Sequence, residues 1–341
     1  MAMSNEATVV DGLLIHHSAF DKALEQLEQC YFYSAHKPEA EGLAIIGPSG
    51  AGKTSVLKAL MEQHNPIRTD DGMNVPILFV PVPAGPTIKN LAGAMIRALG
   101  TPDPERGTVE DKTVRLRVLM EKAGTRMIVL DEFQHFYDRG KRQIMIHVAD
   151  WLKTLIDATR ATIVVAGLPE AQLVIEENPQ LERRFLAPIH LPKFEWSDIE
   201  QREEFFLILE QFHKCISKEF ETPAFHSEQM AYQFWRATDG VIAALTKLLR
   251  HAARKAVTDK RLIIRLDNLA AAREATLSMK EWPVGQPKPF DCGFQLVPTF
   301  DILNRVGNVV TAAATNPASS LRAGRAPMKQ SINHNHLQRA S

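Results

Sequence analysis

The residues whose types and spacing point most directly to chemistry form a short glycine-rich run. Residues 47–54 read Gly-Pro-Ser-Gly-Ala-Gly-Lys-Thr, with an apolar stretch before them and helical spacing after them. This is the pattern of a phosphate-binding loop, or P-loop, in which glycines permit the turn and backbone N–H groups face phosphate oxygens. A glycine-rich turn without a ligand is the alternative, but the pattern and both of its flanks favour nucleotide binding.

Two side chains at the end of this run have defined roles in the pattern. Lys53 is expected to reach the β- and γ-phosphates of ATP, and the Thr54 hydroxyl is expected to bind Mg²⁺. The nucleotide contacts expected from the whole run are Gly47, Pro48, Ser49, Gly50, Ala51, Gly52, Lys53, Thr54 and Ser55.

A pair of carboxylates, Asp131 and Glu132, follows the apolar run 127–130. In P-loop proteins a carboxylate at the end of such a strand completes the metal site, so Asp131 is expected to hold Mg²⁺ through water. Glu132 can polarise the attacking water as a general base, which separates water-activating ATPases from kinases of the same core. The alternative is a solvated acidic turn, which the upstream P-loop disfavours.

Apolar runs alternate with stretches of helical spacing from residue 42 to about residue 192. This alternation predicts an α/β fold with a doubly wound parallel sheet, and the purely helical spacing after it predicts a small helical lid. The expected strands are 42–46, 75–80, 127–130, 162–166 and 185–191. The expected divisions are an N-terminal helical segment at 1–41, the ATPase core at 42–192, the lid at 193–280 and a C-terminal extension at 281–341.

Composition limits the possible partners. The 341 residues contain 40 Lys plus Arg and 40 Asp plus Glu, so no global positive field predicts DNA binding, and any DNA contact must come from a local patch. Residues 302–341 contain no acidic residue, and this extension is expected to be mobile and basic. Its basic residues are Arg305, Arg322, Arg325, Lys329 and Arg339.

The three cysteines and the N-terminus both bear on localisation. Cys30, Cys215 and Cys292 are odd in number and widely spaced, which fits neither a disulfide framework nor a metal knuckle. The first residues lack the pattern of a signal peptide, and no apolar run reaches membrane-spanning length. We therefore expect a cytoplasmic protein that does not bind membranes.

Four stretches in this order resemble the AAA+ ATPases, and within them the transposition regulators of the TnsC/TniB type found in CRISPR-associated and related transposons. The resemblance covers about residues 10–280. Besides the P-loop, the stretches are Asp-Glu-Phe-Gln-His at 131–135, the strand 163–167 leading into Leu-Pro-Glu-Ala, and Pro-Gln-Leu-Glu-Arg-Arg-Phe at 179–185.

The resemblance implies that Arg184 is an arginine finger that one subunit inserts toward the γ-phosphate of its neighbour. An arginine supplied in this way stabilises charge in the transition state, so hydrolysis becomes dependent on assembly. Arg183 is the second choice. The structural alternative is a surface arginine that pairs with Glu177 or Glu182.

Two departures from the family pattern predict slow hydrolysis. The polar residue usual after the fourth strand is missing, because this chain has Val-Ala-Gly at 165–167. The lid helix begins at 240–244 without the arginine that touches the γ-phosphate in many relatives, and Lys247 or Arg250 is the candidate substitute.

The resemblance also places DNA contacts on the loops after the second strand and before the third. Basic or hydroxyl side chains there would meet phosphate oxygens without reading sequence, although ordinary surface residues are the alternative. The candidate DNA contacts are Thr87, Lys89, Arg106, Thr108 and Lys112.

The function implied is an ATP-dependent regulator of DNA transposition and recombination that oligomerises as a ring or filament on double-stranded DNA. Its implied partners are a second copy of itself, a transposase of the TnsB/TniA type and a target selector of the TniQ/TnsD type. The alternatives are an AAA+ ATPase like an initiator or clamp loader, and an ExeA-like secretion or signalling ATPase that does not use DNA.

Overall fold

The computed structural model describes residues 9–10, 13–33, 40–70, 72–137, 142–277, 282, 287–291 and 293–294. The chain divides into two compact units, 1–295 and 296–341, and the second unit lies outside the described residues. The basic character and mobility expected of the extension from residue 302 onward therefore stay predictions.

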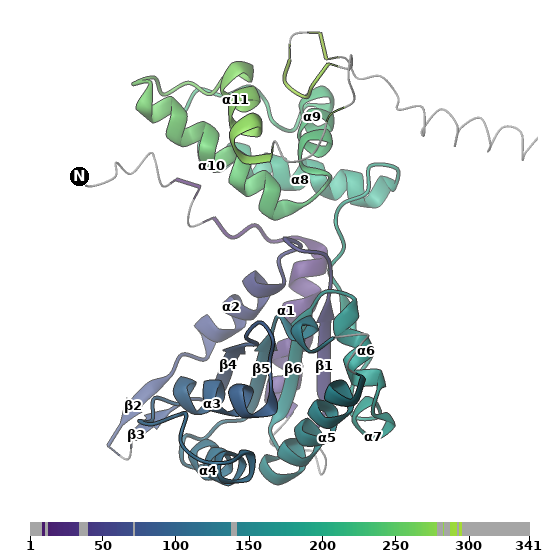
Figure 1. The fold of residues 1–341 in the computed structure, drawn as a ribbon. Helices are drawn as coiled ribbons and strands as arrows, with labels where there is room; N and C mark the ends of the chain where they lie inside the picture. Colours follow the sequence, from purple (N-terminus) through teal and green to yellow (C-terminus); the bar gives the residue numbers. More distant parts are fainter. Residues whose placement is uncertain are drawn as a thin grey trace, which may run out of the picture. The chain divides into compact units, whose positions relative to one another are not determined.

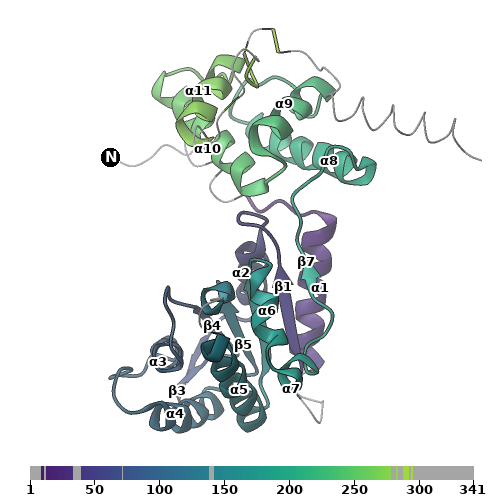
Figure 2. The ribbon, with the colours of Figure 1, turned by 45° about the vertical axis from the view of Figure 1, so that its right-hand side comes forward.

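The first unit is built around a five-stranded sheet in the order β4-β5-β6-β1-β7 (Figure 1). All neighbouring strands run parallel, and β7 lies beside β1 (Figure 2). Parallel strands covered on both faces must be apolar throughout, and β1, β5 and β6 are buried at every residue. The predicted α/β sheet is confirmed. Its strands are β1 (Gly42–Ile46), β4 (Ile77–Pro81), β5 (Met127–Asp131), β6 (Thr162–Gly167) and β7 (Ile189–His190).

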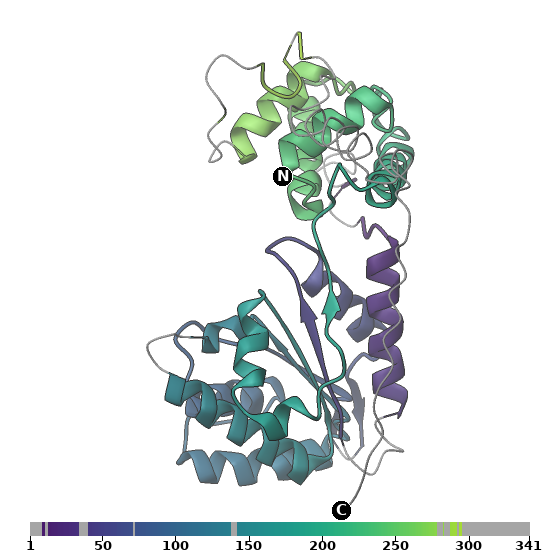
Figure 3. The same ribbon diagram turned by 90° about the vertical axis from the view of Figure 1, so that its right-hand side faces the viewer.

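The strands β1, β4, β5 and β6 each supply two cores, because successive side chains point to opposite faces of the sheet. Ala44 and Ile46 pack in the cluster on one face, whereas Leu43 and Ile45 pack against α1 and α2 on the other. Figure 3 shows α1, in purple, on one side of the sheet. Each fully buried leucine or isoleucine stabilises the fold by about 1.5–3 kcal/mol. The helices are α1 (Ser18–Tyr33) and α2 (Lys53–Gln63) on the second face, and α3 (Ile88–Ala98), α4 (Val109–Lys122), α5 (Arg142–Thr159), α6 (Glu170–Glu176) and α7 (Pro179–Glu182) in the cluster on the first.

Residues 199–277 form four further helices, as the purely helical spacing predicts. Leu245 and Leu249 of the third are fully buried, as expected of apolar residues one helical turn apart. The domain boundary predicted between the core and these helices stays a prediction, because both belong to the first compact unit. The helices are α8 (Ile199–Ile216), α9 (Glu228–Thr238), α10 (Ile242–Thr258) and α11 (Leu266–Leu277).

A small hairpin between α2 and β4 was not predicted. Its strands β2 (Ile67–Thr69) and β3 (Gly72–Asn74) pair antiparallel, and all their described side chains are exposed. Strands of three residues carry too little apolar alternation to give a sequence signal.

None of the helices within the described ranges combines the length and apolar character needed to cross a membrane. The described His, Cys, Asp and Glu side chains also form no group of three or more that could hold a metal ion. Cys30 is buried and Cys215 half-buried, both as free thiols, while Cys292 lies outside the described residues.

Candidate nucleotide site

The P-loop connects the end of β1 at Ile46 to the start of α2 at Lys53. Gly52 caps this helix in the left-handed region, with φ of 99°, a conformation that costs glycine far less than other residues. A Cβ added to Gly52 would meet no atom within 4 Å, so the loop has open space on that side. The loop therefore offers the N-terminus of α2, with its unpaired N–H groups, to an anion.

Lys53 is buried, with 8% of its surface exposed, and its ammonium group turns back onto the loop. Its Nζ donates hydrogen bonds to the carbonyl oxygens of Gly47 at 2.8 Å and Pro48 at 2.9 Å. Burial lowers the pKa of Lys53, while the neighbouring carboxylates of Glu132 and Asp131 act in the opposite direction. A desolvated ammonium group beside open N–H donors fits a site for phosphate groups.

Thr54 and Asp131, 77 residues apart in the sequence, are in direct contact. The Thr54 hydroxyl donates to Asp131 Oδ2 at 2.8 Å, and Asp131 Oδ1 accepts a hydrogen bond from the N–H of Glu132 at 2.9 Å. A hydroxyl and a carboxylate are the hard oxygen ligands that Mg²⁺ prefers. These two side chains could hold a magnesium ion beside the phosphates.

Glu132 has a strained backbone at the end of β5. Its φ of 58° and ψ of 36° lie in the left-handed region, which costs a residue with a Cβ about 1–2 kcal/mol. Such strain gathers at functional sites, where it is part of how a side chain is aimed. The Glu132 side chain lines a 240 Å³ pocket together with Ser49, Gly50, Gly52, Lys53, Thr54, Ser55, Gln134, Leu168 and Ala243.

A second pocket, of 360 Å³, adjoins the P-loop and was missed by the sequence analysis. Apolar residues 13–15, just before α1, form one side of it, and α10 contributes Ala243, whose N–H donates to Gly50 O at 3.2 Å. Burial lowers the pKa of His17, which also lines it. Phe20 adds to the apolar side, while Lys58 and Arg250 supply charged groups, so the pocket offers both kinds of contact. The run Leu-Leu-Ile at 13–15 was the only signal available.

The two candidate substitutes for the missing lid arginine lie in different surroundings. Lys247 Nζ donates to the carbonyl oxygen of Thr276 at 3.1 Å, on α11. Arg250 lines the pocket that adjoins the P-loop. Arg250 is therefore the better placed of the two.

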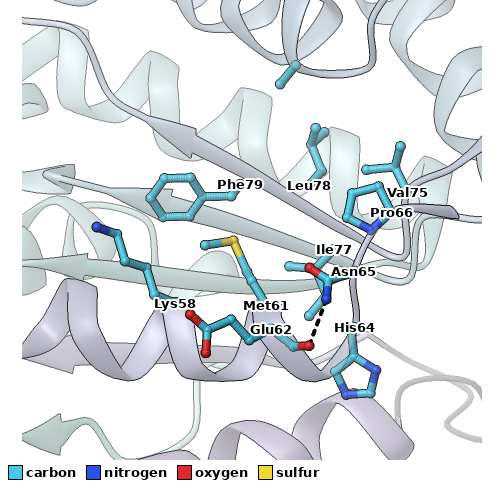
Figure 4. A pocket seen from close by; sticks show the side chains of 11 residues that line it. Lys58, Met61, Glu62, His64, Asn65, Pro66, Val75, Ile77, Leu78 and Phe79 are labelled. Atoms are coloured by element: carbon cyan, nitrogen blue, oxygen red, sulfur yellow. Dashed lines mark hydrogen bonds between the residues drawn. The ribbon is translucent and has the colours of Figure 1, made fainter. Parts of the chain in front are cut away.

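Another pocket lies beside the edge strand β4 and contains none of the P-loop residues (Figure 4). Met61 and Phe79 give it apolar walls, and Asn65 donates to the carbonyl oxygen of Glu62 at 2.9 Å beside it. With its volume of 420 Å³ it is larger than the pocket at Glu132, but it lacks the phosphate-facing N–H groups.

Arg184 and the P-loop lie at opposite ends of the parallel strands. Its carbonyl oxygen accepts a hydrogen bond from Gly42 N at 2.7 Å, at the start of β1, whereas the P-loop follows the end of that strand. The five residues of β1 separate these two ends by about 16 Å. Arg184 therefore cannot serve the P-loop of its own chain.

The alternative expected for Arg184, an ion pair with Glu177 or Glu182, names the wrong partner. Arg184 Nη2 pairs instead with Asp157 Oδ1 at 2.6 Å, and Glu177 pairs with Arg142 at 2.7 Å. The Arg184 side chain is 20% exposed. Asp157 lies on α5, whose position relative to the Arg-Arg-Phe stretch is a tertiary contact that local sequence does not encode.

The prediction that Lys112 contacts DNA is wrong, because its side chain is fully buried. Its Nζ lies 3.4 Å from both Glu105 Oε2 and the carbonyl oxygen of Lys89, between α3 and α4. A lysine in this position pins two helices together and cannot reach a DNA phosphate from there.

The other four candidates are exposed: Thr87 and Lys89 lie at the start of α3, and Arg106 and Thr108 lie just before α4. Thr87 Oγ1 accepts from Asn90 N at 3.1 Å, and Thr108 forms a capping box with Asp111. Both threonines therefore cap helices, which explains them without DNA. Lys89 and Arg106 stay candidates for DNA contacts.

The comparisons with known proteins agree with this geometry. Residues 7–196 match the family described as "Bacterial TniB protein". No match is found among curated proteins. Among solved structures, Cdc6p from Pyrobaculum aerophilum is similar with a TM-score of 0.59 and 16% identity, covering 81% of this chain and 72% of that chain.

Two proteins of Aeropyrum pernix are similar as well. The ORC2 protein in its ADPNP-ADP complexes has a TM-score of 0.58 and 18% identity, covering 81% of this chain and 72% of that chain. The ORC1 protein in complex with DNA has a TM-score of 0.57 and 16% identity, covering 80% and 71%. At these identities the structures establish a shared fold. With its P-loop, its adjacent carboxylates and a family match over more than half of its length, this chain belongs to the TniB family and is an AAA+ ATPase.

Proposed function

We propose that this chain is an ATP-dependent regulator of DNA transposition that oligomerises on double-stranded DNA and links target selection to the transposase. The observation that carries assembly is the position of Arg184, at the start of β1, while the P-loop follows the end of the same strand. A complete site then needs two copies of the chain. Membership of the TniB family supports transposition as the process.

Within one chain, each residue of the site has a separate task. The N–H groups of the P-loop and the Lys53 ammonium group hold the phosphates, and Thr54 with Asp131 holds Mg²⁺. When bound, the metal ion offsets the charge on the phosphate oxygens. Glu132 takes a proton from the attacking water as a general base.

The adjoining pocket is the proposed place for the base and ribose of the nucleotide. It shares Gly50, Gly52 and Ser55 with the P-loop, and its apolar side is formed by residues 13–15. The lowered pKa of His17 keeps its imidazole neutral near pH 7, which suits contact with an uncharged base. Since α10 also lines this pocket, nucleotide binding would order the helical region against the core.

Across the interface, Arg184 supplies a positive charge beside the γ-phosphate that a single chain does not provide. To do so it must leave Asp157, its partner at 2.6 Å. Hydrolysis would thus depend on a neighbour that exchanges this ion pair for a phosphate contact. ATP binding would favour assembly, and hydrolysis would reverse it.

Double-stranded DNA is the proposed surface for assembly. Lys89, in the first turn of α3, and Arg106, in the loop before α4, are both exposed and offer positive charge without base recognition. The similar ORC1 structure is a complex with DNA. The proposed protein partners are a transposase of the TnsB/TniA type and a target selector of the TniQ/TnsD type.

An initiator-like AAA+ ATPase is the second candidate, because the similar structures include Cdc6p and ORC proteins. Such a protein would share ATP-dependent assembly on DNA but would not bind a transposase. Co-purification with a transposase of the TnsB/TniA type separates the two functions.

The test of the proposal is the mass of the full chain by sedimentation, with and without long duplex DNA. We expect large assemblies with DNA and a non-hydrolysable ATP analogue, and small species with ADP. Lys53→Ala should stay small under all conditions, whereas Lys214→Ala, an exposed lysine on α8, should assemble as the parent chain does. Masses that respond to neither nucleotide nor DNA would contradict the proposal.

A further inference from the structure

A side-chain bridge joins Glu132 to the end of β6, and the roles proposed so far do not use it. Gln134 Nε2 donates to Glu132 Oε2 at 2.5 Å, and Gln134 Oε1 accepts a hydrogen bond from Leu168 N at 3.1 Å. Leu168 directly follows the last residue of β6. One amide therefore connects the carboxylate of the general base to a central strand of the sheet.

The orientation of this amide follows from the chemistry of its two partners. A backbone N–H can only donate, so the Gln134 atom that faces Leu168 must be the carbonyl oxygen. The amide NH₂ group then faces Glu132, whose ionised carboxylate can only accept. Flipping the amide would set donor against donor and acceptor against acceptor, so one orientation alone satisfies both partners.

The missing polar residue after β6 is explained by the space that Gln134 occupies. A Cβ added to Gly167 would lie 2.5 Å from Gln134 Oε1, 2.8 Å from the Cβ of Ala171 and 3.2 Å from the backbone nitrogen of Gln134. Any side chain at residue 167 would therefore displace Gln134. The glycine at this position and the glutamine at 134 form one arrangement.

Gln134 is held in place independently of its own side-chain bonds. It lies in the short 3₁₀ helix η2 (Phe133–Phe136), whose two phenylalanines are 0% and 1% exposed. The next residue, His135, is anchored by its Nδ1 to the carbonyl oxygen of Val82 at 2.7 Å. The amide is thus presented to Glu132 from a packed support, as preorganised catalytic groups require.

We propose that Gln134 is a positioning residue for ATP hydrolysis, which fixes the Glu132 carboxylate relative to β6 and replaces the polar side chain that this chain lacks after that strand. The inference rests on the proposed role of Glu132 as the general base. Gln134 acts through Glu132 and through Leu168, and it needs no contact with the nucleotide. Hydrolysis is then supported despite Val-Ala-Gly at 165–167.

The kinetic test uses the full chain on duplex DNA with ATP and Mg²⁺. Gln134→Glu is nearly isosteric and keeps an acceptor for Leu168 N, but it loses the donor and sets a second carboxylate beside Glu132. We expect kcat to fall about 10- to 100-fold, since misplacing a catalytic group by about 1 Å costs this much, with KM changed by less than about threefold. Gln134→Ala should change kcat in the same direction.

The matched control is Gln29→Ala. It removes a hydrogen bond of the same kind, from Gln29 Nε2 to Glu25 Oε1 at 3.2 Å, on the exposed surface of α1. Its kcat and KM should equal those of the parent chain. Gly167→Ala should behave like the Gln134 variants, because the added methyl group displaces the Gln134 amide.

A second readout requires neither ATP nor Mg²⁺. In the parent chain labelled with ¹³C and ¹⁵N, the side-chain amide signal of Gln134 is identified by through-bond assignment, without any Gln134 variant. This signal should shift in Glu132→Ala and stay in place in Glu25→Ala, which lies on α1. The measurement decides the question even if the Gln134 variants fail to fold.

Three outcomes distinguish the positioning role of Gln134 from the general-base role of Glu132. Parent-like kcat in folded Gln134→Glu, with Glu132→Gln inactive, would overturn the positioning role and leave the base role standing. A Gln134 amide signal that does not shift in Glu132→Ala would overturn the positioning role as well. Parent-like hydrolysis by Glu132→Gln would instead remove Glu132 as the base and the inference with it.

Discussion

The two ends of β1 differ in how complete they are within one chain. At the end that leads into the P-loop, Lys53 is held by the carbonyl oxygens of the loop at 2.8–2.9 Å, and Thr54 is bonded to Asp131 at 2.8 Å. At the start of the strand, Arg184 is engaged with Asp157, away from any phosphate site. The first end is preorganised for binding, whereas under the proposed function the second supplies an arginine that acts only on another copy of the chain.

This contrast explains why we expect variants that affect ATP hydrolysis without affecting nucleotide binding. Binding needs contacts that one chain already provides, so it should survive changes at the start of β1. Under the proposed function, hydrolysis also needs the positive charge of Arg184 from a neighbouring copy, so it should respond to changes at either end. Variants at the two ends therefore test different halves of the site.

The largest effect is expected at the P-loop. Lys53→Ala removes the buried ammonium group from the phosphates, and we expect nucleotide affinity to fall by about 100-fold or more, because a hydrogen bond between charged groups is worth about 1.5–3 kcal/mol and Lys53 can make more than one. Titration with a fluorescent ATP analogue measures this loss. Parent-like affinity would show that the loop backbone alone holds the phosphates.

Glu132→Gln should leave nucleotide affinity intact and lower hydrolysis by about 100- to 10,000-fold, the usual contribution of a general base. The amide is nearly isosteric but cannot accept the proton, and Asp131 still faces Thr54. Single-turnover phosphate release on DNA measures the rate, and DNA-bound assemblies should persist. A loss of ATP affinity in this variant would assign Glu132 to binding and not to catalysis.

Sequence reasoning succeeded where a motif is local. The P-loop and the carboxylates after β5 could be found because each has fixed spacing, and the motif class itself implies the Thr54–Asp131 contact across 77 residues. It failed where packing decides the role of a side chain. The burial of Lys112 depends on how α4 packs on α3, and the partner of Arg184 lies on α5. The Gln134 bridge requires knowing that η2 lies beside the end of β6.

A smaller effect is expected for two lysines, Lys112 on α4 and Lys89 on α3, which should differ in what their loss changes. Lys112→Ala should lower the free energy of unfolding by about 2 kcal/mol, because it deletes a buried aliphatic stem that packs between helices. Lys89→Ala, at an exposed position, should leave stability unchanged and reduce the salt slope of DNA binding by about 1. Urea unfolding and DNA titration at several salt concentrations measure the pair. Equal stability of the two variants would contradict the buried role of Lys112.

The smallest effect is expected at Asp157. Asp157→Asn weakens the ion pair of Arg184, which is partly exposed, so stability should change by less than about 1 kcal/mol. ATP affinity should stay the same, while hydrolysis in assemblies should be equal or faster, because Arg184 no longer has to leave a charged partner. Slower hydrolysis with unchanged assembly would show that Asp157 aims Arg184 and does not merely hold it.

The most direct test of a site shared between two chains is complementation between two inactive variants. Arg184→Ala keeps an intact P-loop but has no finger, whereas Lys53→Ala keeps the finger but has a broken P-loop. Arg183→Ala serves as the neighbouring control and should hydrolyse ATP by itself. When Arg184→Ala and Lys53→Ala are mixed on duplex DNA, some interfaces combine the good half of each, and phosphate release should rise well above the sum of the separate variants. Mixed assemblies that form but release no more phosphate than that sum would contradict the shared site.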